Sequence, residues 1–289
     1  MTYTTLISVE QLQTLQASGQ GCMVFDCSFD LMNATQGPAQ YAEAHIPGAV
    51  YANLDTALSA KGDPAVTHAA SGGRHPLPSR EAFAAWLGSM GFENSMQAVV
   101  YDRQGVNYAG RLWWMLKWLG HADVAVLDGG LQAWQAAGLP VAAGAEAARA
   151  ATTFKVQAPL VKLVDVQTVQ NQLGSAKQHV LDARATARFK GEVEPIDPVA
   201  GHIPGALNRP FPTNIGADGR FKPAAQLRAE FETLLGKRSS EDVVHHCGSG
   251  VSAVPNILAM EIAGLGSSAL FAGSWSEWVA DPQRPVAKG

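Results

Sequence analysis

The sequence predicts an α/β protein of two similar domains, each a small parallel sheet with helices on both faces. Short apolar segments with the pattern of buried strands alternate with segments of helical spacing, which is the order of a parallel sheet covered by helices. The same order then occurs a second time, at a period of a domain's length rather than that of a short structural repeat. The 289 residues are enough for two domains of ordinary size.

The first half contains the elements of one such domain. A helix is predicted within Leu6–Gln16, where Ser8 can cap the N-terminus and Gln11 completes a capping box. Strands are predicted where short apolar runs end at turn residues, and helices where apolar residues recur every three or four positions. By these rules the strands are Met23–Asp26, Ala98–Tyr101 and Val124–Leu127, and the further helices are Ser79–Leu87 and Ala109–Leu119.

Three segments of the second half repeat segments of the first. The sequence VLD at 180–182 matches VFD at 24–26, GHIPGA at 201–206 matches AHIPGA at 44–49, and GSWSEW at 273–278 matches GGLQAW at 129–134. We therefore predict a first domain at 1–140 and a second at 154–289. The alanine-rich stretch 141–153, which follows a proline, is the predicted linker.

Composition excludes several classes of protein. The chain is 47% hydrophobic and 16% charged with a net charge of −4, and it has no basic stripe, which argues against nucleic-acid binding. No apolar run is long enough to span a membrane, and residues 1–10 lack the features of a signal peptide, so we expect a cytoplasmic protein. No spacing typical of a metal site is present, and we expect neither a metal nor a cofactor.

The three cysteines divide into two kinds. Cys22 and Cys27 flank the apolar run of a predicted strand, where burial is the expected state. Cys247 instead stands where a strand turns into a helix. An odd number of cysteines without a CxxC pair argues against a disulfide framework. Nucleophilic chemistry is therefore expected at Cys247 alone.

The segment VVHHCGSGVSA at 243–253 is the predicted active-site loop. Its two glycines permit a tight turn, so that successive backbone N–H groups converge at the N-terminus of the following helix and stabilise a thiolate or persulfide anion. In the first half, alignment of the glycines puts Asp102 at the place of Cys247. The sequence thus predicts one active site per chain. The expected cradle of the sulfur anion is formed by Gly248, Ser249, Gly250, Val251 and Ser252.

These motifs together resemble the two-domain rhodanese family of sulfurtransferases over nearly the whole chain. The resemblance implies two rhodanese-like domains and a cysteine that carries sulfane sulfur to a thiophilic acceptor. Family members that use thiosulfate carry basic residues after the cysteine, as in CRKGVT, whereas CGSGVS here is closest to the CGSGVT loop of 3-mercaptopyruvate sulfurtransferases. The implied reaction moves sulfur from 3-mercaptopyruvate through a Cys247 persulfide to cyanide or a thiol. A thioredoxin-like reductant is a further candidate partner.

The resemblance also assigns catalytic roles. Ser249 matches a loop serine that relays a proton or polarises the substrate, and His75 and Asp55 match the histidine and aspartate that approach this serine. Without the resemblance, His75 reads as part of a surface loop and Asp55 as a helix cap.

Substrate binding falls to arginine in this comparison. Arg188 matches the residue that holds the substrate carboxylate, and Arg184 is a second candidate with a more structural role at the strand end. The family's second arginine, nine positions after the first, is replaced here by Asp197. A carboxylate there repels an anionic donor unless another cation compensates, so thiosulfate stays open as the alternative donor. The candidate compensating cations are Arg74, Lys190 and Arg209.

Two functions of other classes are compatible with a cysteine in such a loop. Phosphatases with a Cys-x5-Arg loop need an arginine where this chain has Ala253, which argues against phosphoryl transfer. A non-enzymatic sulfur carrier or protein-binding module is a second alternative, because a fold does not decide a function. Such a module needs no carboxylate-binding arginine, so Arg188→Ala distinguishes it from an enzyme.

Overall fold

A computed structural model of the chain describes residues 2–61 and 70–289, and these form two compact units, each considered by itself. The boundary between the units does not fall at a single point of the sequence, because a short segment of each half belongs to the other unit. Unit 1 comprises the described parts of Met1–Ala69, Pro78–Leu160 and Ala217–Arg220, and unit 2 comprises Ala70–Leu77, Val161–Gly216 and Phe221–Gly289.

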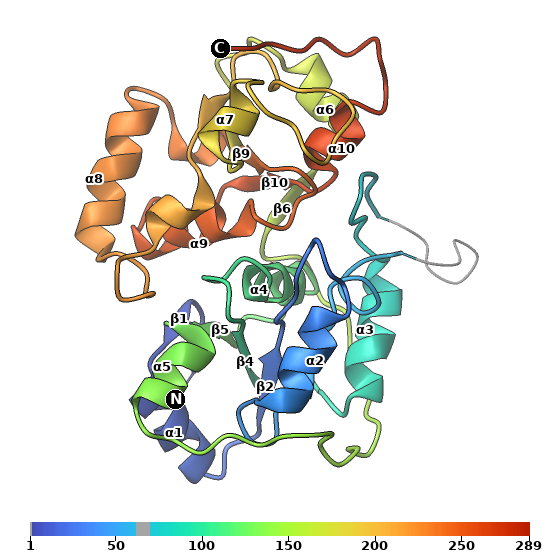
Figure 1. Cartoon of the computed structure of the whole chain (residues 1–289), viewed down its shortest axis with the longest axis vertical. Helices are drawn as coiled ribbons and strands as arrows, with labels where there is room; N and C mark the ends of the chain where they lie inside the picture. The colour runs from blue at the N-terminus through green and yellow to red at the C-terminus, as the bar shows by residue number, and fades with distance from the viewer. Residues whose placement is uncertain (1, 62–69) are drawn as a thin grey trace. The chain divides into compact units, whose positions relative to one another are not determined.

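Both units alternate strands and helices, as the sequence predicts (Figure 1). Unit 1 contains β1 (Leu6–Ile7), α1 (Val9–Ala17), β2 (Cys22–Asp26), α2 (Gln36–Glu43), β3 (Val50–Tyr51), α3 (Arg80–Ser89), β4 (Gln97–Tyr101), α4 (Ala109–Trp118), β5 (Val124–Leu127) and α5 (Gly130–Ala136). Unit 2 contains β6 (Lys162–Val164), α6 (Val166–Asn171), β7 (His179–Asp182), α7 (Thr186–Phe189), β8 (Leu207–Asn208), the 3-10 helix η1 (Phe211–Asn214), α8 (Ala224–Leu235), the 3-10 helix η2 (Ser240–Asp242), β9 (Val243–His246), α9 (Val254–Ile262), β10 (Ala269–Phe271) and α10 (Ser274–Trp278).

The two sheets have the same topology, which confirms the predicted parallel α/β fold. Their strand orders are β1-β5-β4-β2-β3 and β6-β10-β9-β7-β8, and every pair of named strands is parallel. β4 and β9 therefore occupy the same central position in their sheets. Loops at the carboxyl end of a central strand are where open parallel sheets commonly bind ligands.

Helices cover both faces of the unit 1 sheet. Alternate strand residues such as Val24 and Val99 pack with α1 and α5, which lie on one side of the sheet in Figure 1. The residue next to Val24, Phe25, points to the opposite face, as the two-residue period of a strand requires, and its ring meets Trp86 of α3. In unit 2, α6 and α10 cover one face through residues such as Val169 and Trp275.

The start of the chain differs from the prediction at one point. Ser8 caps α1 and forms the expected capping box with Gln11, but Leu6 and Ile7 precede the helix as strand β1. Leu6 is in register with Val126 of β5. A strand of two residues has too few positions to show an alternating pattern, so its pairing with β5 identifies it.

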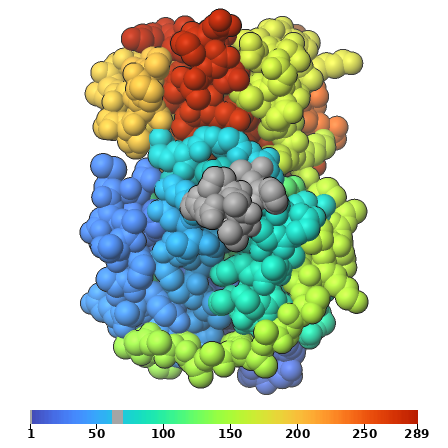
Figure 2. Space-filling view, turned by 90° about the vertical axis from the view of Figure 1, so that its right-hand side faces the viewer, coloured from blue at the N-terminus to red at the C-terminus, as the bar shows by residue number. Residues whose placement is uncertain are grey.

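The predicted linker 141–153 has an extended course over unit 1, and Figure 2 shows this stretch in yellow-green along the lower edge of the blue and teal parts of the unit. The N–H of Ala142 donates to the carbonyl of His45 at 2.9 Å, and the N–H of Thr152 donates to that of Gly88 at 2.8 Å. Glu146 also pairs with the His45 ring at 3.1 Å.

Within the described residues, no helix is long and apolar enough to cross a membrane.

The loop after β4 closes around a buried carboxylate. Asp102 Oδ1 accepts the N–H groups of Gln104 at 2.9 Å and Val106 at 3.0 Å, and Oδ2 accepts those of Tyr108 at 2.8 Å and Ala109 at 2.9 Å. The backbone curls tightly because Gly105 and Val106 both have positive φ, 67° and 69°. Asp102 thus satisfies N–H groups that the turn and the start of α4 leave without carbonyl partners.

We expect Asp102→Ala to lower the free energy of unfolding of unit 1 by about 3 kcal/mol or more, because four N–H groups, three of them in buried hydrogen bonds, lose their acceptor. Chemical denaturation measures the loss in the free energy of unfolding, and hydrogen exchange of β4 and α4 assigns that loss to unit 1. Asp102→Asn is the matched control, since its carbonyl oxygen still accepts two of these N–H groups, and its loss should be smaller. An alanine variant within 0.5 kcal/mol of the parent (about the scatter of neutral surface substitutions) would contradict this account.

Candidate active site

Cys247 directly follows β9, the central strand of unit 2, and is 2% exposed. Its Sγ accepts the N–H of Gly250 at 3.2 Å. Gly250 has a φ of +77°, and a Cβ there would collide with the carbonyl oxygen of Ala272. Only glycine fits this backbone and this close approach, so the second glycine of the CGSG sequence sets the curl that turns N–H groups toward the sulfur.

Residues at the start of α10, just after β10, form hydrogen bonds with the backbone of this loop. Ser274 Oγ accepts the N–H of Cys247 at 3.1 Å. The N–H of Trp275 donates to the carbonyl of Cys247 at 3.0 Å, and the N–H of Ser276 donates to that of Gly248 at 2.9 Å. The repeated segment at 273–278 therefore anchors both sides of the cysteine. Unit 1 has the corresponding contact between the N–H of Leu131 and the carbonyl of Asp102, at 3.4 Å.

The Cys247 sulfur does not accept all the backbone N–H groups of its loop, whereas the Asp102 carboxylate of unit 1 accepts the equivalent groups. Among the described residues, the N–H groups of Val251, Ser252 and Ala253 donate to no protein acceptor. The equivalent turn of unit 1 directs its N–H groups onto the Asp102 carboxylate. The Cys247 loop therefore offers hydrogen-bond donors to an anion that is larger than a single sulfur atom.

Ser249 and His75 meet beside the cysteine loop. Ser249 Oγ and His75 Nδ1 share a hydrogen bond of 2.7 Å, and both residues are nearly buried, at 5% and 1% exposure. His75 belongs to the segment Ala70–Leu77, which the unit division assigns to unit 2 although it lies in the first half of the chain. Asp55 lies in unit 1, where its carboxylate pairs with Lys61 at 2.6 Å.

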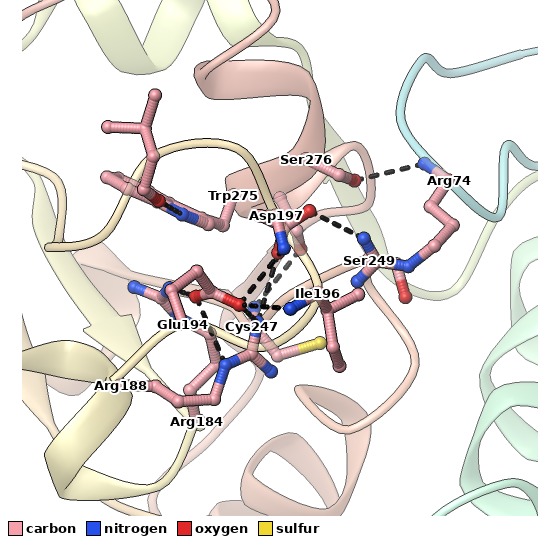
Figure 3. Close-up of polar contacts among 12 residues, drawn as sticks. Arg74, Arg184, Arg188, Glu194, Ile196, Asp197, Cys247, Ser249, Trp275 and Ser276 are labelled. Atoms are coloured by element: carbon pink, nitrogen blue, oxygen red, sulfur yellow. Dashed lines mark hydrogen bonds and ion pairs between the residues drawn. The ribbon is translucent and has the colours of Figure 1, made fainter. Parts of the chain in front are cut away.

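The segment 70–77 is held in place by its own glycines and by α10. Its ends are joined by the N–H of Ala70, which donates to the carbonyl of Leu77 at 2.7 Å. Gly73 has a φ of +84°, and a Cβ there would strike the carbonyl oxygen of Gly273. The N–H of Arg74 donates to Ser276 Oγ at 3.0 Å (Figure 3). These contacts present Arg74 and His75 to the Cys247 loop.

Six alternating charges form a continuous ion-pair chain next to this loop, and Figure 3 labels the five that follow Asp182. It begins at the end of β7 and reaches the segment 70–77. The successive pairs are Asp182–Arg184 at 2.6 Å, Arg184–Glu194 at 3.4 Å, Glu194–Arg188 at 2.7 Å, Arg188–Asp197 at 3.0 Å and Asp197–Arg74 at 2.5 Å. Three arginines thus balance three carboxylates.

Burial and ion pairing shift the carboxyl pKa values of the ion-pair chain in opposite directions. Burial disfavours the charged form of Glu194, but hydrogen bonds from Arg188 and from two backbone N–H groups outweigh it and lower the carboxyl pKa. Burial likewise opposes ionisation of Asp182, and the charges of His246 and Arg184 nevertheless hold its pKa below the usual value. The two carboxylates therefore remain charged at neutral pH.

Each sequence-predicted arginine has a distinct environment. Arg184 is 4% exposed, pairs with Asp182 and lies over the Trp275 ring at 4.6 Å, so its contacts are structural. Arg188 pairs with Glu194 and Asp197 but stays partly exposed. Of the three cations considered for compensation, Arg74 is the one that pairs with Asp197. Arg209 pairs with Glu230 instead, at 2.8 Å.

The sequence did not single out two residues of this ion-pair chain. It indicated no function for Glu194, and it named Arg74 only as one of three candidate cations. The signal that could have singled out Arg74 is its place between a glycine pair and His75, where the backbone must approach another segment closely. Glu194 lies in a loop of irregular structure, whose partners no periodicity reveals.

Two further cysteines and one histidine are poorly suited to nucleophilic or acid–base chemistry at neutral pH. Burial raises the pKa of Cys22 to about 11 and that of Cys27 well above its usual value, so both thiols stay protonated at neutral pH. Burial lowers the pKa of His245 to about 3, which keeps its ring neutral. In the described part of the chain, no group of three or more histidine, cysteine or acidic side chains is arranged to hold a metal ion.

Comparison with known proteins places this geometry in a family. The rhodanese-like domain matches two regions of the chain, residues 8–137 and 165–281. A probable 3-mercaptopyruvate sulfurtransferase of Pseudomonas aeruginosa is 46% identical over the full length of both chains. A putative thiosulfate sulfurtransferase of Mycobacterium tuberculosis, SseB, is 36% identical and the match covers 98% of this chain and 97% of the relative.

Solved structures agree with these matches. The 3-mercaptopyruvate sulfotransferase SseA from Escherichia coli superposes with a TM-score of 0.79 at 30% identity, over 95% of this chain and all of the other. The match spans both units and both sheets described above, and the relatives are sulfurtransferases. The chain therefore belongs to the rhodanese family, as a sulfurtransferase with two rhodanese-like domains.

Proposed function

We propose that this sulfurtransferase takes sulfur from 3-mercaptopyruvate, carries it as a persulfide on Cys247 and passes it to a thiol or to cyanide. The observation that carries the proposal is that, among the described residues, the loop after Cys247 has N–H groups without a protein acceptor at a place where unit 1 holds a carboxylate. A persulfide adds a second, negatively charged sulfur, and this loop supplies donors for such an anion. The name of the relative from Pseudomonas aeruginosa supports the donor.

The reaction follows from thiolate chemistry. The Cys247 thiolate attacks the sulfur of the donor, a sulfur–sulfur bond forms, and the carbon–sulfur bond breaks. The electron pair of the broken bond goes to the carbon, which leaves as the enolate of pyruvate and takes up the proton that the donor sulfur brought. An acceptor thiolate or cyanide then attacks the outer sulfur and restores the Cys247 thiolate.

Ser249 and His75 are the proposed proton relay. Their hydrogen bond of 2.7 Å has the length at which a hydroxyl and an imidazole exchange a proton. The relay would carry the proton from the persulfide to the enolate carbon. Asp55 as an orienting partner remains a prediction from the family resemblance.

The substrate and partner assignments have different support. Arg188, which is partly exposed and next to the loop, is the proposed carboxylate-binding residue, and Arg184 contributes by holding Asp182 and Glu194 in place. A thioredoxin-like reductant as the acceptor, and a cytoplasmic location, are proposals that rest on the sequence alone.

The persulfide can be observed directly. After incubation with 3-mercaptopyruvate without an acceptor, mass spectrometry should find the mass of one additional sulfur atom on the peptide that contains Cys247. Peptides with Cys22 or Cys27 should carry none at pH 7, because burial raises the pKa of both thiols and only a thiolate attacks sulfur. Cys247→Ser should abolish both the added mass and turnover. Sulfur on Cys22 or Cys27 in that variant would refute the assignment.

Variants of the relay should lose rate rather than binding. We expect His75→Gln and Ser249→Ala each to lower kcat by about 100-fold, the scale of general acid–base catalysis, with KM little changed. If the two residues act as one unit, the double variant should be about as slow as either single variant. Losses that multiply in the double variant would show that the two side chains act independently.

The donor is decided by turnover of 3-mercaptopyruvate and thiosulfate side by side, with cyanide as acceptor. We expect a higher kcat/KM for 3-mercaptopyruvate, because the loop carries no basic residue for a dianion between Cys247 and Ser252. A higher kcat/KM for thiosulfate would favour the alternative donor, which the name of the Mycobacterium tuberculosis relative carries.

A further inference from the structure

Two neighbouring side chains of α10 hold the segment that carries His75. The first is Ser276, whose N–H donates to the carbonyl of Gly248 at 2.9 Å and whose Oγ accepts the N–H of Arg74 at 3.0 Å (Figure 3). The Ser276 hydroxyl donates its own hydrogen to the carbonyl of Gly273 at 3.2 Å, which leaves its lone pairs for the Arg74 N–H. Ser276 therefore links the backbone beside the nucleophile to the residue that precedes His75.

The second side chain is the carboxylate of Glu277. A Cβ placed on Gly72 would collide with Glu277 Oε1, so the carboxylate lies directly against the Gly72 backbone. The N–H of Gly72 donates to this carboxylate. Burial raises the pKa of Glu277, while the positive charge of Arg284 and the hydrogen bond from Gly72 oppose this shift. The half-buried carboxylate is thus an acceptor that fits only a backbone without a side chain.

The segment is closed on itself, so its two attachments to α10 determine where His75 lies. The N–H of Ala70 donates to the carbonyl of Leu77 at 2.7 Å, and the N–H of Leu77 donates to Ser71 Oγ at 2.9 Å. Both attachments lie within this closed loop and precede His75. The hydrogen bond of 2.7 Å between His75 Nδ1 and Ser249 Oγ therefore depends on them.

Unit 1 has different residues at the two equivalent positions. The repeated segments align Ser276 with Gln132 and Glu277 with Ala133. Gln132 donates to the carbonyl of Arg103 at 3.0 Å, and the side chain of Ala133 carries no polar group. The contacts with the segment thus come from two side chains that only the second copy of the repeat has. They occur in the half of the chain that carries the nucleophile.

We propose that Ser276 and Glu277 are positioning residues for sulfur transfer, which hold the backbone of segment 70–77 and thereby keep His75 at hydrogen-bond distance from Ser249. This proposal rests on the relay of the proposed function and adds two residues that act through His75. A misplacement of about 1 Å can lower an enzymatic rate about 100-fold. Loss of an attachment should therefore slow the step that needs the relay and affect donor binding little.

Kinetics of matched variants test the two attachments. We expect Ser276→Ala and Glu277→Ala each to lower kcat about tenfold, with KM changed by less than about twofold. Glu277→Gln should keep kcat within about threefold of the parent, because the amide oxygen still accepts the Gly72 N–H and burial does not disfavour an uncharged group. The matched control is Glu232→Ala, at a glutamate of α8 with 60% side-chain exposure, which should change neither constant. A loss in Glu277→Gln as large as that in Glu277→Ala would refute the role of the acceptor oxygen.

A second set of variants tests whether the two residues act through His75. In a His75→Gln background, Ser276→Ala and Glu277→Ala should each lower kcat by less than about twofold further, because an absent ring cannot be misplaced. A residue that only supports the cysteine loop would instead multiply its loss with that of His75→Gln. Losses that multiply would therefore overturn the proposal.

Hydrogen exchange gives a readout that does not depend on activity. In the whole chain, amides of segment 70–77 should exchange about tenfold faster in Ser276→Ala and Glu277→Ala than in the parent, whereas β9 should keep its exchange rate. Unchanged exchange of the segment in both variants would overturn the attachment, and faster exchange with the kcat of the parent would overturn its role in catalysis. If His75→Gln is as fast as the parent, the relay of the proposed function fails, and the exchange rates still decide whether the two side chains hold the segment.

Discussion

The convergence of backbone N–H groups after the central strand of each sheet is the constraint on which the rest of this structure depends. Such a turn needs a negative group at its centre, because its N–H groups face one another without carbonyl partners. Unit 1 supplies the carboxylate of Asp102 and thereby closes the turn. Unit 2 supplies the sulfur of Cys247, which one N–H contacts at 3.2 Å. The same fold therefore places a carboxylate at the centre of the turn in one unit and a thiol in the other.

A second constraint is that buried charges must be paired. The chain of alternating charges from Asp182 to Arg74 keeps three arginines beside the cysteine loop without an unpaired ion. This arrangement also explains how an aspartate can be buried at position 197, close to the proposed donor site. Arg74 neutralises it, and the two arginines that it joins retain donors toward the loop.

Much of the fold was predictable from local sequence. Ser8 and Gln11 form their capping box, the repeated segments occupy equivalent places in two sheets of equal topology, and Cys247 follows the strand predicted before it. These features depend on neighbours a few positions apart, whose spacing the sequence displays directly. Strand β1 was missed because two residues cannot show a period, and only its pairing with β5 defines it.

The sequence by itself determined the duplicated parallel α/β fold and the family, and it predicted Cys247 as the one cysteine suited to chemistry. Tertiary structure showed which distant side chains contact one another beside the loop of that cysteine. Arg74 and Asp197 are 123 positions apart, and His75 and Ser249 are 174 apart. Periodicity reports which face of an element is buried but not which distant segment covers it. That choice depends on the packing of segment 70–77 against α10, where Gly73 approaches the Gly273 carbonyl and the Arg74 N–H reaches Ser276.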